Sequence, residues 1–211
     1  MNDDGWLRAL LKRLHAPIYD RRIRTLASHI TPHLREGDRV LDVGCGCGEL
    51  GRAILDAPSC PPAVRVCGVE QRRRGNEPID VQAFDGLTIP GAERTYDVVM
   101  LADVLHHIAD PERLVQECIR VSKRLLIIKD HTVNGVLARQ RLALLDWAAN
   151  APYGVPCLYR YRTAAQWTEA FHRHRLVVEE ARTSMALYPF GLDLLFGGPL
   201  HCFTVLRVPG A

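Results

Sequence analysis

The chain has 211 residues, enough for one domain with a substantial hydrophobic core. Hydrophobic residues make up 47% of it and charged residues 24%, as in soluble globular proteins, and a net charge of +3 is too small to indicate nucleic-acid binding. Seven cysteines, an odd number, exclude a regular disulfide framework and favour reduced thiols in a cytoplasmic protein.

The first part of the chain is predicted to form two helices. Leucines recur at helical spacing near the N-terminus, which predicts an amphipathic helix over residues 3–15. A second helix is expected over residues 18–30, with Ile23, Leu26 and Ile30 facing inward. The chain contains neither a signal-peptide pattern nor a run of roughly 18 apolar residues, so no membrane span and a soluble cytoplasmic protein are expected.

Short apolar runs and helical segments alternate through the middle of the chain. The runs RVLDV, VRVCGVE, YDVVMLAD and RLLIIKD are rich in valine and isoleucine, which is typical of a parallel sheet covered on both faces. Helical patterns follow the first and third runs, and the second of these helices begins with Asp110 as N-cap and Pro111 at its first position. This order predicts an α/β fold with a doubly wound, mostly parallel sheet.

The last third of the chain departs from this alternation. An insertion that is helical at about residues 135–149 is predicted to form a lid, and two later runs, RLVVEEART and HCFTVLRV, are predicted to pair as antiparallel strands at the sheet edge. The expected parts of this single domain are N-terminal helices over 1–36, a ligand-binding core over 37–130, the lid over 131–162, and a C-terminal helix and strand pair over 163–211.

Aromatic residues gather in and just after the predicted lid. We expect them to line an apolar substrate pocket, although they would also suit the core of a small cap. They are Trp147, Tyr153, Tyr159, Tyr161 and Trp167. Tyr19 is a further candidate for contact with a ligand, from the second helix.

The run RVLDVGCGCGEL breaks from a strand directly into glycines. Glycine permits positive φ and a close approach of backbone to a ligand, and ligands of doubly wound sheets bind at the carboxyl ends of the strands. The spacing is G-x-G-x-G, not the G-x-G-x-x-G of a dinucleotide fold, and no G-x-x-x-x-G-K-[ST] phosphate loop is present. Asp42 beside the loop suits a sulfonium or ammonium ligand better than a diphosphate, which makes a dehydrogenase the least favoured alternative.

Four motifs in order carry a resemblance to a known family. VLDVGCGCG resembles the first motif of the class I S-adenosylmethionine (SAM)-dependent methyltransferases, VCGVE their second strand, AFDG their adenine-contacting loop, and YDVVMLADVLHHIADPERLVQE the fourth strand with its helix. RLLIIKDH resembles their fifth strand, so the matches span about residues 38–132. VLHHIADPERL is most similar to the subset that acts on small molecules such as quinones and natural products. The resemblance implies methyl transfer to a small-molecule acceptor, with S-adenosylhomocysteine (SAH) as product.

The resemblance also implies which residues hold SAM. Glu70 would accept hydrogen bonds from both ribose hydroxyls, Asp85 one from the adenine amino group, and Asp103 would lie near the methionine end. The full implied set is Asp42, Gly44, Cys45, Gly46, Gly48, Glu70, Gln71, Asp85, Gly86, Ala102 and Asp103. The simpler alternative gives Asp42 and Asp85 a helix-capping or turn-capping role and pairs Glu70 with Arg72 or Arg73.

His107 and His131 are the candidate catalytic bases, because both follow strands that end at the glycine loop and imidazole titrates near neutral pH. We favour His131 because it stands at the mouth of the predicted lid, and Asp130 is expected to project to its opposite side. In the simpler alternative, His107 hydrogen-bonds to the loop backbone. No metal site is predicted, since the Cys45–Cys47 pair has no second pair at zinc spacing.

Two other functions fit the same motifs. An RNA or protein methyltransferase would need a basic groove, and the arginine runs at 21–24 and 72–74 are the candidates for one. We interpret these arginines as solvated, which makes nucleic acid an unfavoured partner. A non-catalytic SAM-binding module would bind the cofactor without turnover.

Overall fold

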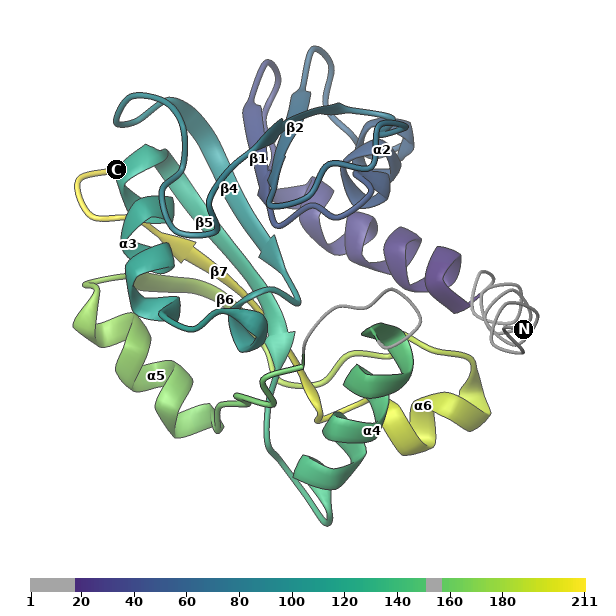
Figure 1. Ribbon diagram of the computed structural model, residues 1–211. Helices are drawn as coiled ribbons and strands as arrows, with labels where there is room; N and C mark the ends of the chain where they lie inside the picture. The colour runs from purple at the N-terminus through teal and green to yellow at the C-terminus, as the bar shows by residue number, and fades with distance from the viewer. Residues whose placement is uncertain (1–17, 151–156) are drawn as a thin grey trace, which may run out of the picture.

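The computed structural model describes residues 18–150 and 157–211 (Figure 1). The helix expected over residues 3–15 and the side chain of Tyr153 lie outside the described residues. No helix within the described part has the length and apolar character needed to cross a membrane.

A seven-stranded sheet forms the centre of the fold, with strand order β3-β2-β1-β4-β5-β7-β6. Strands β1 to β5 pair in parallel, whereas β7 runs antiparallel to both β5 and β6. The predicted mostly parallel sheet and its C-terminal antiparallel pair are confirmed. The strands are β1 Arg39–Val43, β2 Arg65–Glu70, β3 Asp80–Ala83, β4 Tyr96–Ala102, β5 Ser122–His131, β6 Val177–Arg182 and β7 His201–Arg207.

The edge strand β3 was not among the predicted strands. Of its four residues only Val81 is buried, so the segment has no apolar run to reveal it. Its pairing with β2 places the following Asp85 loop at the same end of the sheet as Glu70.

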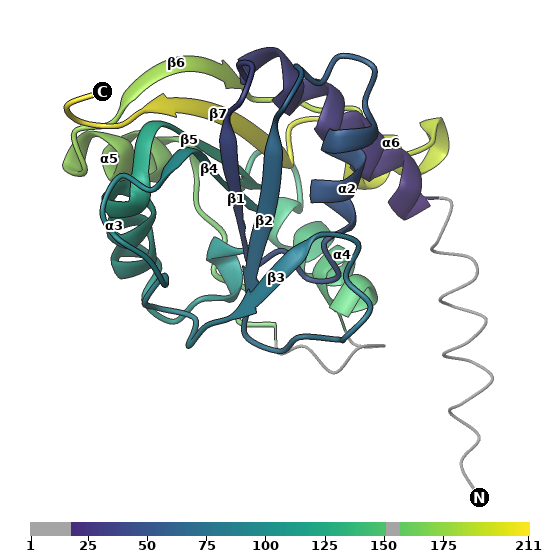
Figure 2. The ribbon, with the colours of Figure 1, turned by 90° about the horizontal axis from the view of Figure 1, so that it is seen from above.

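Helices cover both faces of the sheet (Figure 2). The helix over residues 18–30, as predicted, and α2 pack on one face, where Ile23, Leu26 and Ile30 are all buried. The helices α3 and α5 pack on the other face. Besides the helix over residues 18–30, the described part contains α2 Glu49–Asp56, α3 Pro111–Val121, α4 Ala138–Asn150, α5 Ala164–Arg173 and α6 Phe190–Phe196, with short 3-10 helices η1 Thr31–His33 and η2 Leu105–His107.

The helices α4 and α6 lie beyond the carboxyl ends of β4 and β5 and cover that end of the sheet (Figure 1). The predicted insertion helix is α4, and its Leu142 is fully buried in a small cluster with Tyr161 and Leu200. Arg141 of α4 also donates a hydrogen bond to the carbonyl oxygen of Leu195 in α6. The insertion is therefore packed against the rest of the domain through α4.

Candidate functional site

The glycine loop leaves β1 with positive φ at each of its three glycines, 71° at Gly44, 58° at Gly46 and 76° at Gly48. A Cβ at Gly44 would lie 2.7 Å from Val104, and one at Gly48 would lie 2.8 Å from Ile79. A Cβ at Gly46 would meet no atom within 4 Å, because the tip of the loop faces an open cleft. Two glycines are thus required by packing, and the third leaves bare backbone toward the cleft.

Glu70, at the end of β2, holds the tip of the glycine loop. Its carboxylate accepts hydrogen bonds from the backbone N–H of Gly46 and of Gln71, each at 2.8 Å. The adjacent ends of β1 and β2 therefore bring the predicted acid and the predicted loop together. The lone pairs left on the carboxylate suit the recognition of hydroxyl groups.

Asp42 lies within β1 and is only 2% exposed. Its Oδ2 has no hydrogen-bond partner, and burial, with a smaller effect of Glu70, raises its pKa to about 8. The carboxyl is therefore largely neutral at pH 7, and Asp42 is not among the residues that line the cleft. Asp42 therefore does not offer the exposed anion that its position in the sequence suggested.

We expect Asp42→Asn to flatten the dependence of stability on pH. Because the folded pKa of about 8 exceeds the ordinary value of 3.8, folding takes up a proton between these limits, and stability falls as pH rises. The slope is at most about 1.4 kcal/mol per pH unit. Urea unfolding of both proteins at several pH values between these limits measures it. Parallel curves for the two proteins would mean that Asp42 is ionised in the fold.

The predicted adenine-contacting loop begins with a turn. Asp85 Oδ1 accepts hydrogen bonds from the backbone N–H of Leu87 and Thr88, at 2.7 and 2.6 Å, so this carboxylate caps the turn. Those bonds lower its pKa. Gly86 adopts φ 87°, and a Cβ there would collide with the Gln71 side chain. The structure thus joins the Gln71 and Gly86 loops at one end of the sheet.

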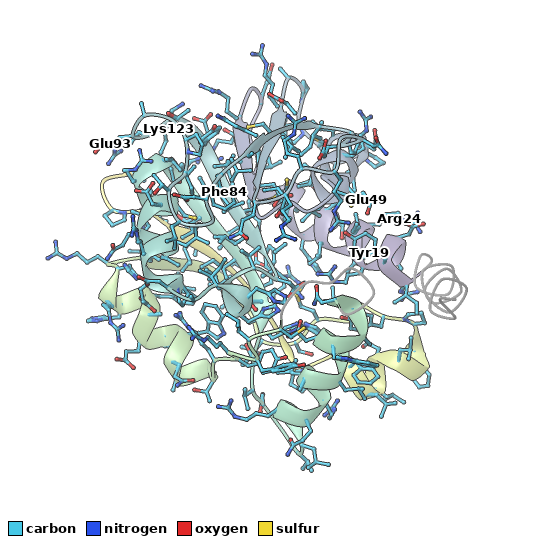
Figure 3. The ribbon with its side chains drawn as sticks, in the orientation of Figure 1. Tyr19, Arg24, Glu49, Phe84, Glu93 and Lys123 are labelled. Atoms are coloured by element: carbon cyan, nitrogen blue, oxygen red, sulfur yellow. The ribbon has the colours of Figure 1, made fainter. Side chains whose placement is uncertain are left out.

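A cleft of about 380 Å³ opens beside the glycine loop. The helix over residues 18–30 forms one wall, and α4 contributes the wall across from the loop. Tyr19 and Glu49 line it from the helix over residues 18–30 and the start of α2 (Figure 3). The predicted site residues that line it are Gly46, Ala102, Asp103, His107 and His131.

Asp103, which follows β4, is the centre of a partly buried ion-pair group. Lys129 Nζ approaches its two carboxylate oxygens to 2.5 and 2.7 Å, and Arg22 donates a hydrogen bond to Oδ2. Burial raises the pKa of Asp103, but Lys129 and Arg22 outweigh it and hold the pKa well below its usual range. Asp103 itself takes φ 58°, which turns the chain sharply at the end of the strand.

The interpretation of residues 21–24 as solvated arginines is therefore wrong for Arg22. The helix presents this residue to the cleft, on the same side as Tyr19, and the Asp103 carboxylate compensates for the cost of partly burying its charge. Arg74, from the second arginine run, also lines the cleft and donates to Cys47 Sγ at 3.1 Å.

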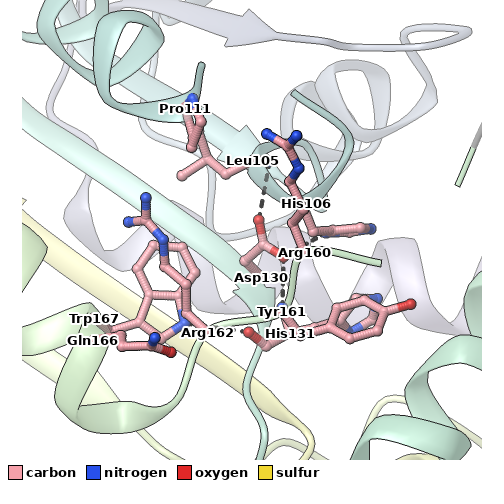
Figure 4. Close-up of a pocket in the computed structure, with 10 residues that line it drawn as sticks. All are labelled: Leu105, His106, Pro111, Asp130, His131, Arg160, Tyr161, Arg162, Gln166 and Trp167. Atoms are coloured by element: carbon pink, nitrogen blue, oxygen red, sulfur yellow. Dashed lines mark hydrogen bonds and ion pairs between the residues drawn. The ribbon is translucent and has the colours of Figure 1, made fainter. Parts of the chain in front are cut away.

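His106 forms a buried dyad with Asp130 (Figure 4). Its Nδ1 lies 2.6 Å from Asp130 Oδ1, while the same carboxylate accepts from the backbone N–H of Leu105 and of His131. Burial lowers the pKa of His106, but Asp130 and Asp146 outweigh it and raise the pKa to about 10. The prediction that Asp130 does not orient the His131 ring is confirmed, because its side chain holds His106 instead.

The two candidate bases both line the cleft but differ in exposure. The His107 side chain is 18% exposed, and its Nε2 lies 3.4 Å from Asp146 Oδ1. His131 is 5% exposed: it ends β5, a buried strand, directly before the segment predicted to form the lid. Burial, more than any other effect, lowers the pKa of His131 well below its ordinary value, which leaves the ring neutral at pH 7.

The predicted aromatic pocket is only partly present. Tyr161 and Trp167 are buried and line a smaller cavity of about 210 Å³ beside His131 (Figure 4). Trp147 and Tyr159 are 57% and 43% exposed and line neither cavity. Tyr161 Oη donates to Asp146 Oδ2 at 2.9 Å, so its role near the cleft is polar.

Sequence reasoning missed Arg22, His106, Lys129 and Asp146. A signal for Lys129 was available, because a lysine directly after the apolar run Leu125–Ile128 is buried if the strand continues. Asp146 had a similar signal, an acid on the insertion helix four residues after Leu142 and hence on the same face.

The chain is similar to known methyltransferases in sequence. A family model described as a methyltransferase domain matches residues 12–180. The ubiquinone biosynthesis O-methyltransferase of Rhizobium etli is 26% identical over 121 residues, which are 54% of this chain and 48% of that protein. The chain spans about half the length of the curated relatives it matches.

Solved structures share the fold at low sequence identity. An S-adenosylmethionine dependent methyltransferase from Mesorhizobium loti superposes with a TM-score of 0.63 at 15% identity, covering 85% of this chain and 96% of that one. The [4+2]-cyclase SpnF has the same TM-score of 0.63 at 16% identity, covering 90% of this chain and 81% of that one. Identities this low show a shared fold alone.

Proposed function

This chain belongs to the methyltransferase domain family, and we propose that it transfers the methyl group of SAM to a hydroxyl of a small-molecule acceptor and releases SAH. The observation that carries this proposal is the contact of the Glu70 carboxylate with the backbone of Gly46, at the edge of a cleft. A hydroxyl acceptor is supported by the O-methyltransferases of ubiquinone biosynthesis among the relatives.

The residues around the glycine loop fit SAM. Gly46 leaves space where a side chain would otherwise stand, and Glu70 offers carboxylate oxygens to ribose hydroxyls next to it. Gln71, Asp85 and Gly86 would flank the adenine, and Ala102 with Asp103 would flank the methionine end, as the resemblance implies. Bound SAM would supply an activated methyl group, so the protein's main work is to align the acceptor and exclude water.

We expect SAH to stabilise the purified chain and NAD to leave it unchanged. A ligand at 100 times its dissociation constant stabilises the folded state by about 2.7 kcal/mol, which is readily seen as a rise in melting temperature. The measurement is a thermal melt with SAH, SAM or NAD at matched concentrations. A shift with NAD and none with SAH would refute the proposed function.

Glu70→Ala is expected to weaken SAH binding by about 1.5–3 kcal/mol, the usual loss for a hydrogen bond to a charged acceptor. Titration calorimetry with SAH measures the effect directly. The matched control is Glu70→Gln, which keeps an acceptor oxygen for the Gly46 N–H while removing the charge. If Glu70→Ala binds SAH like the wild type, the ribose assignment is wrong.

Methyl transfer to a hydroxyl also requires loss of its proton. His131 is the base that we propose, because its neutral imidazole lines the cleft. His107 lines the same cleft and is the second candidate.

A SAM-binding module without methyl transfer is the second candidate function. A neighbour described as a [4+2]-cyclase shares this fold, so the fold is compatible with other chemistry. Screening hydroxylated small molecules for SAH release distinguishes the two: binding of SAH with no SAH release from any acceptor would favour the module.

A further inference from the structure

Three side chains meet on the cleft wall formed by α4. His106 and His107 come from η2, and Asp146 comes from the middle of α4. One potential ligand atom from each lies within 4.8 Å of the other two. Two imidazoles and one carboxylate are the donor set that Zn²⁺ and neighbouring first-row divalent ions prefer.

The distances within this group match shared coordination. Asp146 Oδ1 lies 3.6 Å from His106 Nε2 and 3.4 Å from His107 Nε2. Direct N–H···O hydrogen bonds usually measure roughly 2.7–3.2 Å. Two ligands that bind one zinc ion at 2.0–2.1 Å with a tetrahedral angle are about 3.4 Å apart. The carboxylate oxygen is thus spaced from each of the two ring nitrogens as two ligands of a common ion are.

The surrounding residues orient the ligands as they do in zinc sites. Asp130 Oδ1 lies 2.6 Å from His106 Nδ1, which turns Nε2 of that ring toward Asp146. Asp146 is itself held by Tyr161 Oη at 2.9 Å and by Asn150 Nδ2 at 2.7 Å. Carboxylate partners behind a ligating histidine, and donors behind a ligating carboxylate, are the usual outer shell of a metal ion.

Two neighbouring groups of potential metal ligands both include Asp103, and the charges around them differ from those around Asp146. There, Lys129 and Arg22 already neutralise the carboxylate, and a metal ion would meet their positive charges. At Asp146 the two nearest donors are the neutral amide of Asn150 and the hydroxyl of Tyr161. With Asp130, the site carries two carboxylates, which together match the charge of one divalent ion once that ion has displaced the Nε2 proton of His106.

We propose that His106, His107 and Asp146 bind one zinc ion, with Asp130 as the outer partner of His106. Asp146 and the two histidines line the cleft, so the remaining coordination position faces its interior. Three protein ligands with one open position are the arrangement of catalytic zinc sites. The open position would take an oxygen of the acceptor; that step rests on the proposed function, whereas zinc binding does not.

Titration of the metal-free full chain with Zn²⁺ by calorimetry tests the site. We expect one ion per wild-type chain, and at least tenfold weaker binding by Asp146→Asn and by His107→Ala, because outer partners alone typically contribute 10–100-fold. His172→Ala, on the exposed side of α5, and Cys47→Ser, which removes a cleft thiol, should bind zinc like the wild type. Circular dichroism without metal checks that each variant folds.

Several results would overturn the site. These are no zinc binding by the wild type, unchanged binding by His107→Ala, or loss of binding in Cys47→Ser. Replacing zinc by Co²⁺ gives a second readout for any variant with altered folding: a thiolate charge-transfer band would place the ion on cysteine, against the proposal. SAH binding is measured in a separate titration. If the chain binds SAH but does not bind zinc, the proposed function stands and the zinc site is refuted.

Discussion

His131→Ala is expected to lower turnover by about 10²–10⁴-fold, the usual contribution of a general base, with little change in SAH affinity. His131 lines the cleft at the end of β5, and burial keeps its imidazole neutral at pH 7, in the form that accepts a proton. Its Nε2 lies 3.8 Å from Asp103 Oδ1, so the protonated ring that forms during the reaction would face a carboxylate.

The measurement is SAH release against pH, using an acceptor found in the screen. Because the pKa of His131 is lowered, the acid limb of the wild-type profile should fall below the ordinary histidine value of 6.5. His172→Ala, at an exposed position on α5, is the matched control, and His107→Ala tests the second candidate. Near-wild-type turnover by both His131→Ala and His107→Ala would mean that alignment alone carries the reaction.

Local patterns were sufficient to predict most of the fold. The strand β1 and the helix over residues 18–30 occupy the predicted residues, because β1 is a short apolar run and the helix carries apolar residues at helical spacing. The edge strand β3 was missed because three of its four residues are not buried. Pairing with β2 stabilises it, and that contact is not visible in the local sequence.

The sequence was sufficient to predict the part of the site that one strand end and one loop form. Gly46 and Glu70 come together because β1 and β2 are adjacent in the sheet. Contacts between distant segments were not predictable: Arg22 reaches Asp103 across 81 positions, and the burial that lowers the pKa of His131 depends on the packed neighbours of β5. An isolated histidine in a sequence carries no information on that burial.

Asp103→Asn is expected to destabilise the fold by about 3–5 kcal/mol, the usual cost of removing one partner from a buried ion pair. The buried Lys129 ammonium would then lack its carboxylate, and Arg22 would lose the same partner. Two cations would remain in a poorly solvated place, which is less favourable than leaving both in water in the unfolded chain. Urea unfolding at pH 7 measures the loss.

Asp97→Asn is the matched control for this variant. Asp97 pairs with Lys123 at 2.9 Å, but the two side chains are 24% and 43% exposed, so the loss should stay within about 1 kcal/mol. The loss of stability caused by Asp103→Asn, relative to the wild type, should also become smaller as the pH falls. The pKa of Asp103 is held well below 3.8, so its contribution to stability is present above that value and disappears only as acid protonates the folded carboxyl. Equal losses in the two variants at pH 7 would mean that water solvates Lys129 and Arg22 in the folded protein, and that this carboxylate is not required to hold the end of β4 beside the cleft.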